Sequence, residues 1–203
     1  GAISNLLGNS QPGKGTIDFE ALFIPDDALQ VRKLVPLLKY YGVRVKTHPR
    51  PRKRSGSLVQ LLGVEAWNSA AVIDGEGLTN NAVFVDTFIH DPDDPHNDRF
   101  VRGFYARHRR KPNAFQAEVF DMMNIVARAM KPLDGTDHGA REALMASLLS
   151  TKHHRGVTGH ITILDDGAMV LKPRLLTVHL EDIRLRVSEE EETYLRRSSG
   201  VTP

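Results

Sequence analysis

The stretch that decides the fold runs Gly156-Val157-Thr158-Gly159-His160-Ile161-Thr162-Ile163-Leu164-Asp165-Asp166-Gly167, and Lys172-Pro173-Arg174-Leu175-Leu176-Thr177-Val178 follows it. Its first part predicts a short strand that ends in a tight Asp-Gly turn, because Gly167 can supply the positive φ that such a turn requires. The part from Lys172 onward is again rich in β-forming residues. Together the two parts predict a β-hairpin.

Length and composition bound the class of protein. The chain has 203 residues, 40% of them hydrophobic, so it can bury a core in one domain or two small ones. No apolar run approaches the ~20 residues that span a bilayer, and the start has neither an initiator Met nor a signal pattern. We therefore expect the native start to lie upstream. A net charge of +2 does not by itself call for nucleic acid or an anionic membrane.

The first element after a linker-like segment at residues 1–15 is predicted from a nearly continuous apolar run at residues 17–24, typical of a strand buried on both faces of a parallel sheet. Asp26 is then placed to cap an amphipathic helix whose apolar residues recur from Leu29 to Leu38. Gly42 is placed to stop this helix, and Pro36 should kink it.

Further strands are predicted at residues 43–46, 59–64 and 82–88, so the first half of the chain is a β-α-β arrangement with a mainly parallel sheet. Helices are predicted at residues 98–110 and 114–130, and a third from 139 or 140 to about 150. Residues 188–203 form a charged tail that we expect to be frayed.

Five polar or aromatic residues follow the apolar strand runs and are the candidate ligand-binding residues. In an open α/β sheet, the C-terminal ends of parallel strands deliver such residues to one crevice. Two of them have an equally plain structural explanation, since Asp26 suits a helix cap and Trp67 can plug the boundary between sheet and helix. The five residues are Asp26, Glu65, Trp67, Asn68 and Asp86.

Other constellations argue against catalysis, metal binding and nucleic acid. Asp91, Asp93, Asp94 and Asn97 resemble a calcium loop, but its glycine and closing glutamate are lacking. No phosphate-cradling loop or nucleophile motif occurs, so we expect a non-enzyme with no catalytic residues, cofactor or metal. The basic residues 46–54 are interpreted chiefly as a solvated loop, because no aromatic residue is interleaved there to stack on bases.

Several motifs, in the same order along the chain, resemble the C-terminal half of type I periplasmic binding proteins. The family comprises branched-chain amino acid receptors and their penicillin-binding-protein-activator relatives. The resemblance covers about residues 17–187. Its motifs are the runs at 18–25, 41–43, 61–69 and 84–86, the segment from Phe100 through Pro112 to residues 117–121, and the hairpin words quoted above.

This resemblance implies an α/β three-layer sandwich with a mainly parallel sheet, incomplete because only one half of a bilobal receptor is present. Residues 16–187 would form the type I-like region. Within it, residues 97–152 would be helices of the other lobe, and 156–187 the closing hairpin and strands. The sheet under those helices would come from the missing half. Their apolar faces should then be covered by a homo-oligomer or by the missing N-terminal half.

The resemblance also implies a function. It predicts a non-catalytic, extracytoplasmic solute-binding receptor that delivers an amino acid or similar small polar solute to an ABC transporter permease. Glu65 occupies the place of the acidic residue that receives the ligand's ammonium group, whereas Pro25-Asp26-Asp27 stands where the family often has an aromatic residue. The alternative is a periplasmic regulator akin to penicillin-binding-protein activators, which would bind a cell-wall synthase and no small molecule. A lipoprotein anchor is compatible with both.

Overall fold

The computed structural model describes residues 17–49, 58–131 and 139–186. The predicted linker at 1–15, most of the basic loop and the charged tail lie outside these residues. The chain divides into two compact units, which are described separately. Unit 1 comprises Gly1–Asp86 and Leu175–Pro203, and unit 2 comprises Thr87–Arg174.

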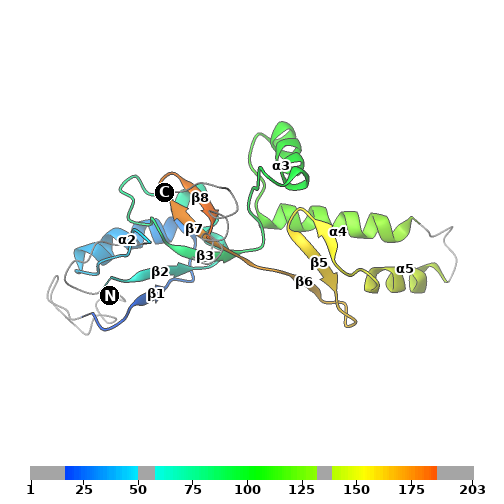
Figure 1. The fold of residues 1–203 in the computed structure, drawn as a ribbon, viewed down its shortest axis with the longest axis horizontal. Helices are drawn as coiled ribbons and strands as arrows, with labels where there is room; N and C mark the ends of the chain where they lie inside the picture. Colours follow the sequence, from blue (N-terminus) through cyan, green and yellow to red (C-terminus); the bar gives the residue numbers. More distant parts are fainter. Residues whose placement is uncertain (1–16, 50–57, 132–138, 187–203) are drawn as a thin grey trace, which may run out of the picture. The chain divides into compact units, whose positions relative to one another are not determined.

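Unit 1 is built on a five-stranded sheet in the order β1-β2-β3-β7-β8 (Figure 1). β1 pairs with β2, and β2 with β3, in parallel, whereas β7 and β8 form an antiparallel pair. The sheet is therefore mainly parallel around its first three strands, as the sequence predicts. The strands are β1 (Ala21–Phe23), β2 (Gln60–Gly63), β3 (Val83–Asp86), β7 (Arg174–His179) and β8 (Asp182–Leu185).

The start of β3 meets the end of β7 through Asn81. Asn81 has φ 61°, and its N–H donates to the Val178 carbonyl at 2.8 Å, while the Val178 N–H donates to the Ala82 carbonyl at 3.2 Å. This hydrogen-bond pattern is that of a β-bulge whose first residue is left-handed, and such a bulge occurs between antiparallel strands, here β3 and β7.

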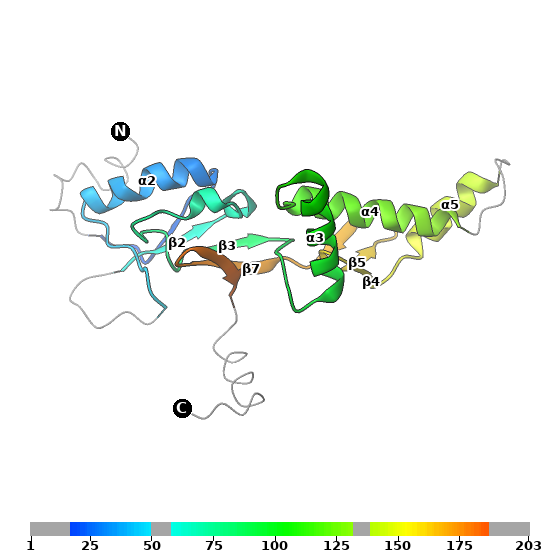
Figure 2. The same ribbon diagram turned by 90° about the horizontal axis from the view of Figure 1, so that it is seen from above.

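Helix α2 (Ala28–Tyr40) runs along the sheet of unit 1 (Figure 2) and buries Val31, Val35 and Leu38. It ends as predicted, because Gly42 follows with φ 87°. The predicted cap is wrong by one residue. The Asp27 carboxylate, not that of Asp26, accepts hydrogen bonds from the Leu29 and Gln30 N–H groups.

Two strand predictions in unit 1 need correction. The run at residues 17–24 was expected to be buried on both faces, but β1 occupies only three of these residues and lies at the sheet edge, where Phe23 is 57% exposed. Apolar continuity cannot distinguish an edge strand from a central one. The strand expected at residues 43–46 is reduced to a single parallel bridge between Val45 and Val59.

Unit 2 contains three helices and a three-stranded antiparallel sheet among the residues described for it. The helices α4 and α5 match the predictions. Helix α3 begins three residues early, because Asp94 caps it and Pro95 fills its first position, where a missing N–H costs nothing. The elements are α3 (Pro95–His108), α4 (Ala114–Met130), α5 (Ala140–Leu149), β4 (His154–Gly156), β5 (Gly159–Ile163) and β6 (Met169–Leu171).

The predicted hairpin is confirmed, with one change in its second arm. β5 pairs with β6 around a turn in which Gly167 has φ 86°. The Leu164 N–H donates to the Ala168 carbonyl at 2.8 Å and closes the turn. The residues after Lys172 leave the hairpin and continue as β7 of the five-stranded sheet.

The core of unit 2 gathers α3, α4 and the chain before β5. Phe88, Val101, Ala117 and Val157 are buried together, and Phe100 packs against them. Phe100 lies on one of the helices whose apolar faces are expected to need cover from outside the chain, and for this residue the expectation is corrected. Its ring lies 4.6 Å from that of Phe120 and 6.0 Å from that of Phe88.

Candidate functional site

The candidate residues meet at one edge of the unit 1 sheet. β1, β2 and β3 are parallel, so Asp26, Glu65 and Asp86 all stand at the C-terminal ends of neighbouring strands. The Trp67 Nε1–H donates to the Asp26 carbonyl at 3.0 Å, which joins the ends of β1 and β2 directly. The predicted placement is confirmed, and a role in ligand binding stays a prediction.

Trp67 is buried beneath this edge of the sheet. It ends the short 3₁₀ helix η1 (Glu65–Trp67), and its side chain is fully buried. The indole lies against the Cα of Gly63, where a Cβ would collide with the ring, and its centroid is 6.2 Å from that of Phe84. Of the two explanations that the sequence left open, the structure places Trp67 in the core.

Asn68 and Asp86 bind each other. The Asn68 Nδ2–H donates to Asp86 Oδ2 at 2.7 Å, and Asp86 is only 5% exposed. A buried carboxylate needs such hydrogen bonds to offset its loss of hydration. The pair therefore ties the end of η1 to the end of β3 and gives the edge a fixed shape.

Asp26 and Glu65 are the exposed carboxylates among the five candidates. Asp26 Oδ1 accepts the Asp27 N–H at 2.8 Å, and Glu65 opens η1. Asp27 is engaged in capping α2. The edge thus offers carboxylate oxygens to solvent, an arrangement suited to charge-assisted hydrogen bonds with a cationic group.

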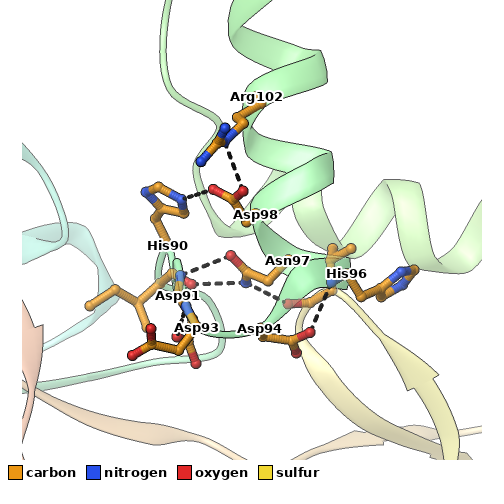
Figure 3. A network of polar contacts seen from close by, with 10 residues as sticks. His90, Asp91, Asp93, Asp94, His96, Asn97, Asp98 and Arg102 are labelled. Atoms are coloured by element: carbon orange, nitrogen blue, oxygen red, sulfur yellow. Dashed lines mark hydrogen bonds and ion pairs between the residues drawn. The ribbon is translucent and has the colours of Figure 1, made fainter.

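A second polar network lies in unit 2, around the start of α3 (Figure 3). It includes the acidic residues weighed as a calcium loop. Asp91 Oδ1 accepts the Asp93 N–H at 3.1 Å, and Asp94 Oδ1 accepts the His96 N–H at 2.9 Å. This backbone hydrogen bond, with Arg155 nearby, lowers the pKa of Asp94. No cluster of three or more potential metal-ligating side chains occurs in the parts of the chain that are described.

Two buried polar residues of unit 2 bind main-chain groups, a role that the sequence pattern does not predict, although Asn97 belongs to the segment that resembles a calcium loop. The Asn97 Nδ2–H group donates to the Ile89 and Val157 carbonyls, both at 3.0 Å. The Asp121 carboxylate accepts the N–H of Val157 at 2.8 Å, and the N–H and Oγ1–H of Thr158 at 2.9 and 2.7 Å. A signal was present, because Asp121 interrupts the apolar repeat of Ala117, Ile125 and Ala129 on α4.

Comparison with solved structures shows which known proteins have the fold of this chain. A putative branched-chain amino acid transporter protein from Rhodospirillum rubrum aligns with TM-score 0.65 at 20% identity, over 82% of this chain and 44% of its own. LivJ from Streptococcus pneumoniae, solved with isoleucine, gives 0.61 at 19%, over 90% and 45%. A Desulfitobacterium hafniense substrate-binding protein, solved with Leu, gives 0.59 at 18%, over 83% and 44%.

The chain therefore has the fold of type I periplasmic binding proteins and spans less than half the length of these relatives, as expected of a C-terminal half. At these identities the likeness establishes the fold. No protein-family model and no curated protein matches the sequence. No helix among the described residues is long and apolar enough to cross a membrane.

Proposed function

We propose that the protein is a non-catalytic extracytoplasmic receptor for an amino acid or similar small polar solute, which it delivers to an ABC transporter permease. The observation that supports this proposal most is that Glu65 and Asp26 both present exposed carboxylates at the C-terminal edge of the parallel strands. The solved relatives with leucine and isoleucine support the same class of ligand.

The negative charge of Asp26 and Glu65 determines which group of the ligand binds at this edge. Asp26 and Glu65 would attract an ammonium group and repel a carboxylate, so the ligand's carboxylate must be bound elsewhere. Leucine and its analogue without the amino group, 4-methylpentanoate, therefore distinguish the proposal from nonspecific apolar binding.

The test is calorimetric titration of the protein with leucine, isoleucine and 4-methylpentanoate. We expect the amino acids to bind and 4-methylpentanoate not to bind. Glu65→Gln removes the charge and keeps the shape, and it should weaken amino-acid binding by about 2 to 5 kcal/mol, at least roughly 30-fold.

Glu76→Gln is the matched control, because Glu76 is an exposed glutamate in the loop before β3 and lies near the β7–β8 turn, not at the C-terminal ends of β1, β2 and β3. It should leave the affinity unchanged. Equal binding of leucine and 4-methylpentanoate, or an unchanged affinity in Glu65→Gln, would contradict the proposed role of Glu65.

A second candidate function is a periplasmic regulator of a cell-wall synthase, with or without a lipid anchor. This function is favoured by the internal contacts of three of the five candidate residues. Trp67 is buried and Asn68 donates a hydrogen bond to Asp86, so these side chains are already engaged within the protein. This function predicts that none of the amino acids binds, whereas the purified synthase does.

A further inference from the structure

Helix α3 ends in a strongly basic run, Arg107-His108-Arg109-Arg110-Lys111, which leads to the start of α4 and is called here the basic turn. All five of its side chains are exposed. No Asp or Glu occurs between Arg99 and Ala117. Because the whole chain has a net charge of only +2, positive charge is concentrated in this part of the sequence and is not spread evenly over the protein.

The exposure of the basic turn is that of the polar side of an amphipathic helix. α3 buries Val101 and packs Phe100 against the core of unit 2, so its apolar side already has a partner within the unit. The charged side needs no further cover, because charged side chains are stable in water. Its exposure therefore follows from the packing of unit 2 itself.

The charges of the basic turn are not neutralised by the residues described around them. Every ion pair within α3 involves Asp98 in the first turn of the helix, and no ion pair among the described residues includes a member of the basic turn. The helix dipole favours positive charge only in the last turn, where Arg107 and His108 lie. The three cations that follow increase the local repulsion without this benefit.

The backbone of Arg109 shows that the charge is kept at an energetic cost. Arg109 caps the C-terminus of α3 with φ 57°, the left-handed conformation in which helices most often place glycine. A side chain makes this conformation less favourable than it is for glycine. Since glycine would end the helix with less strain, an arginine at this position indicates a use for its charge.

Phe104 holds two members of the basic turn in place. The Arg110 guanidinium lies 5.2 Å from the centre of the Phe104 ring, and the His108 ring lies 4.4 Å from it. Arg110 Nη1 also donates to Gln116 Oε1 at 3.5 Å. A guanidinium has five N–H donors, so Arg110 is oriented and can still donate two parallel hydrogen bonds to a phosphate group.

We propose that the basic turn is a docking surface for an anionic phospholipid membrane. Each Arg or Lys near such a surface strengthens binding about fivefold, and the four in the basic turn act together. Tyr105, which is 51% exposed and lies one turn before Arg109, has an amphipathic ring of the kind that favours the headgroup level of a bilayer. Four charges give reversible binding, roughly several hundredfold above that to neutral lipid.

The choice of a membrane as the partner, instead of a nucleic acid, rests on the proposed function. A receptor that serves an ABC transporter works outside the cytoplasm and beside the bilayer that holds the permease. Attraction of the basic turn to phospholipid phosphates would keep the receptor close to that bilayer and raise its rate of encounter with the permease.

The first test is co-sedimentation of the protein with vesicles. We expect binding to vesicles that contain phosphatidylglycerol and no binding to vesicles of phosphatidylcholine alone. Raising the salt concentration should release the protein, because it shortens the distance over which exposed charges attract each other. The test contains no amino acid, so its failure would be distinguishable from a failure of the receptor to bind leucine.

The second test is Arg109→Gly, which separates lipid binding from folding. This variant removes one charge and relieves the left-handed strain. The urea midpoint of the helical circular dichroism should therefore rise, while the affinity for phosphatidylglycerol vesicles falls about fivefold. Arg107→Gln combined with Lys111→Gln should lower the affinity about 25-fold. Arg141→Gln is the matched control, because Arg141 is an exposed arginine on α5 of the same unit. It should leave the affinity unchanged.

Three results would overturn the proposal. One is equal binding to both kinds of vesicle, or binding to neither. Another is an unchanged vesicle affinity in the variants of the basic turn, or an equal loss in Arg141→Gln, which would show that only net charge matters. The last is binding of an oligonucleotide or of polyglutamate by a protein that does not bind anionic vesicles, which would assign the basic turn to another class of partner.

Discussion

His154 lies on β4, partly buried between charged groups of unit 2. Its burial lowers the pKa, the positive charge of Arg128 and the neighbouring His96 lower it further, and the Asp121 carboxylate raises it in part. The neutral imidazole is therefore the form that the folded state favours. Protonation in the unfolded chain occurs near the ordinary histidine value, about 6.5.

This shift gives unit 2 a pH-dependent stability. Because the folded pKa lies below the unfolded one, the stabilisation is fully present above about pH 6.5 and is lost as pH falls toward the folded pKa. We expect the free energy of unfolding, from urea titrations, to decrease between about pH 7 and pH 5. His154→Gln should flatten this decrease, and His160→Gln, which changes an exposed side chain on β5, is the control. An unchanged slope in His154→Gln would refute the assignment.

The lowered pKa values of Asp94 and Asp98 act in a different window. Hydrogen bonds from the His96 backbone to Asp94, and from His90 and Arg102 to Asp98, favour the carboxylate forms. Their stabilisation is present above about pH 4 and is lost only as pH falls through the lowered pKa values. The histidine window can therefore be measured separately.

At the scale of elements, β2 and η1 depend on a close contact between Gly63 and Trp67. A Cβ on Gly63 would overlap the indole ring, whose other side is enclosed by the core. Gly63→Ala should therefore displace the ring and destabilise unit 1 by about 1 to 3 kcal/mol, the usual range for overpacking.

The single tryptophan makes this prediction easy to measure. Fluorescence of Gly63→Ala should shift to longer wavelength, and its urea midpoint should fall. Gly103→Ala on α3 is the control, because a Cβ there meets nothing within 4 Å and alanine favours the helix. That variant should be neutral or stabilised by up to about 1 kcal/mol. Wild-type fluorescence and midpoint in Gly63→Ala would show that the core can adjust.

Local signals predicted the helices well and the strands less well. The bounds of α4 follow from its periodicity, and Asn113 and Gln116 form a capping box that fixes its start. Strand length depends on neighbours far along the chain, so residues 43–46 could not be distinguished from a full strand. The division of the hairpin's second arm between two sheets is likewise a long-range effect.

The location of the candidate site was predictable, because the C-terminal ends of parallel strands lie at one edge of a sheet. The burial and hydrogen bonding of its side chains were not predictable. Burial of Trp67 depends on Gly63 leaving space for the ring, and the Asn68–Asp86 hydrogen bond depends on how η1 turns back. Neither property is encoded in local sequence pattern.

At the scale of the whole molecule, each unit has its own core. Trp67 reports on unit 1, and Asp121 holds unit 2 together through three hydrogen bonds. Asp121→Ala leaves these donors without a partner and should destabilise unit 2 by about 3 kcal/mol or more.

Hydrogen exchange and fluorescence together separate the two units. In Asp121→Ala the amides of Val157 and Ile161 should exchange faster, while the urea midpoint of Trp67 fluorescence should stay constant. Asp165→Ala serves as the control, because its side chain is fully exposed. A parallel loss in both probes would mean that the units unfold as one.

The way in which Val157 is held has a consequence for variation among homologues. Its N–H donates a hydrogen bond to the Asp121 carboxylate on α4, and its carbonyl accepts one from the Asn97 side chain on α3. Two helices therefore bind the main chain of this one residue. Main-chain groups are the same in every amino acid other than proline at the N–H. Position 157 should therefore vary among apolar residues of similar volume in homologues, whereas Asn97 and Asp121 should be nearly invariant.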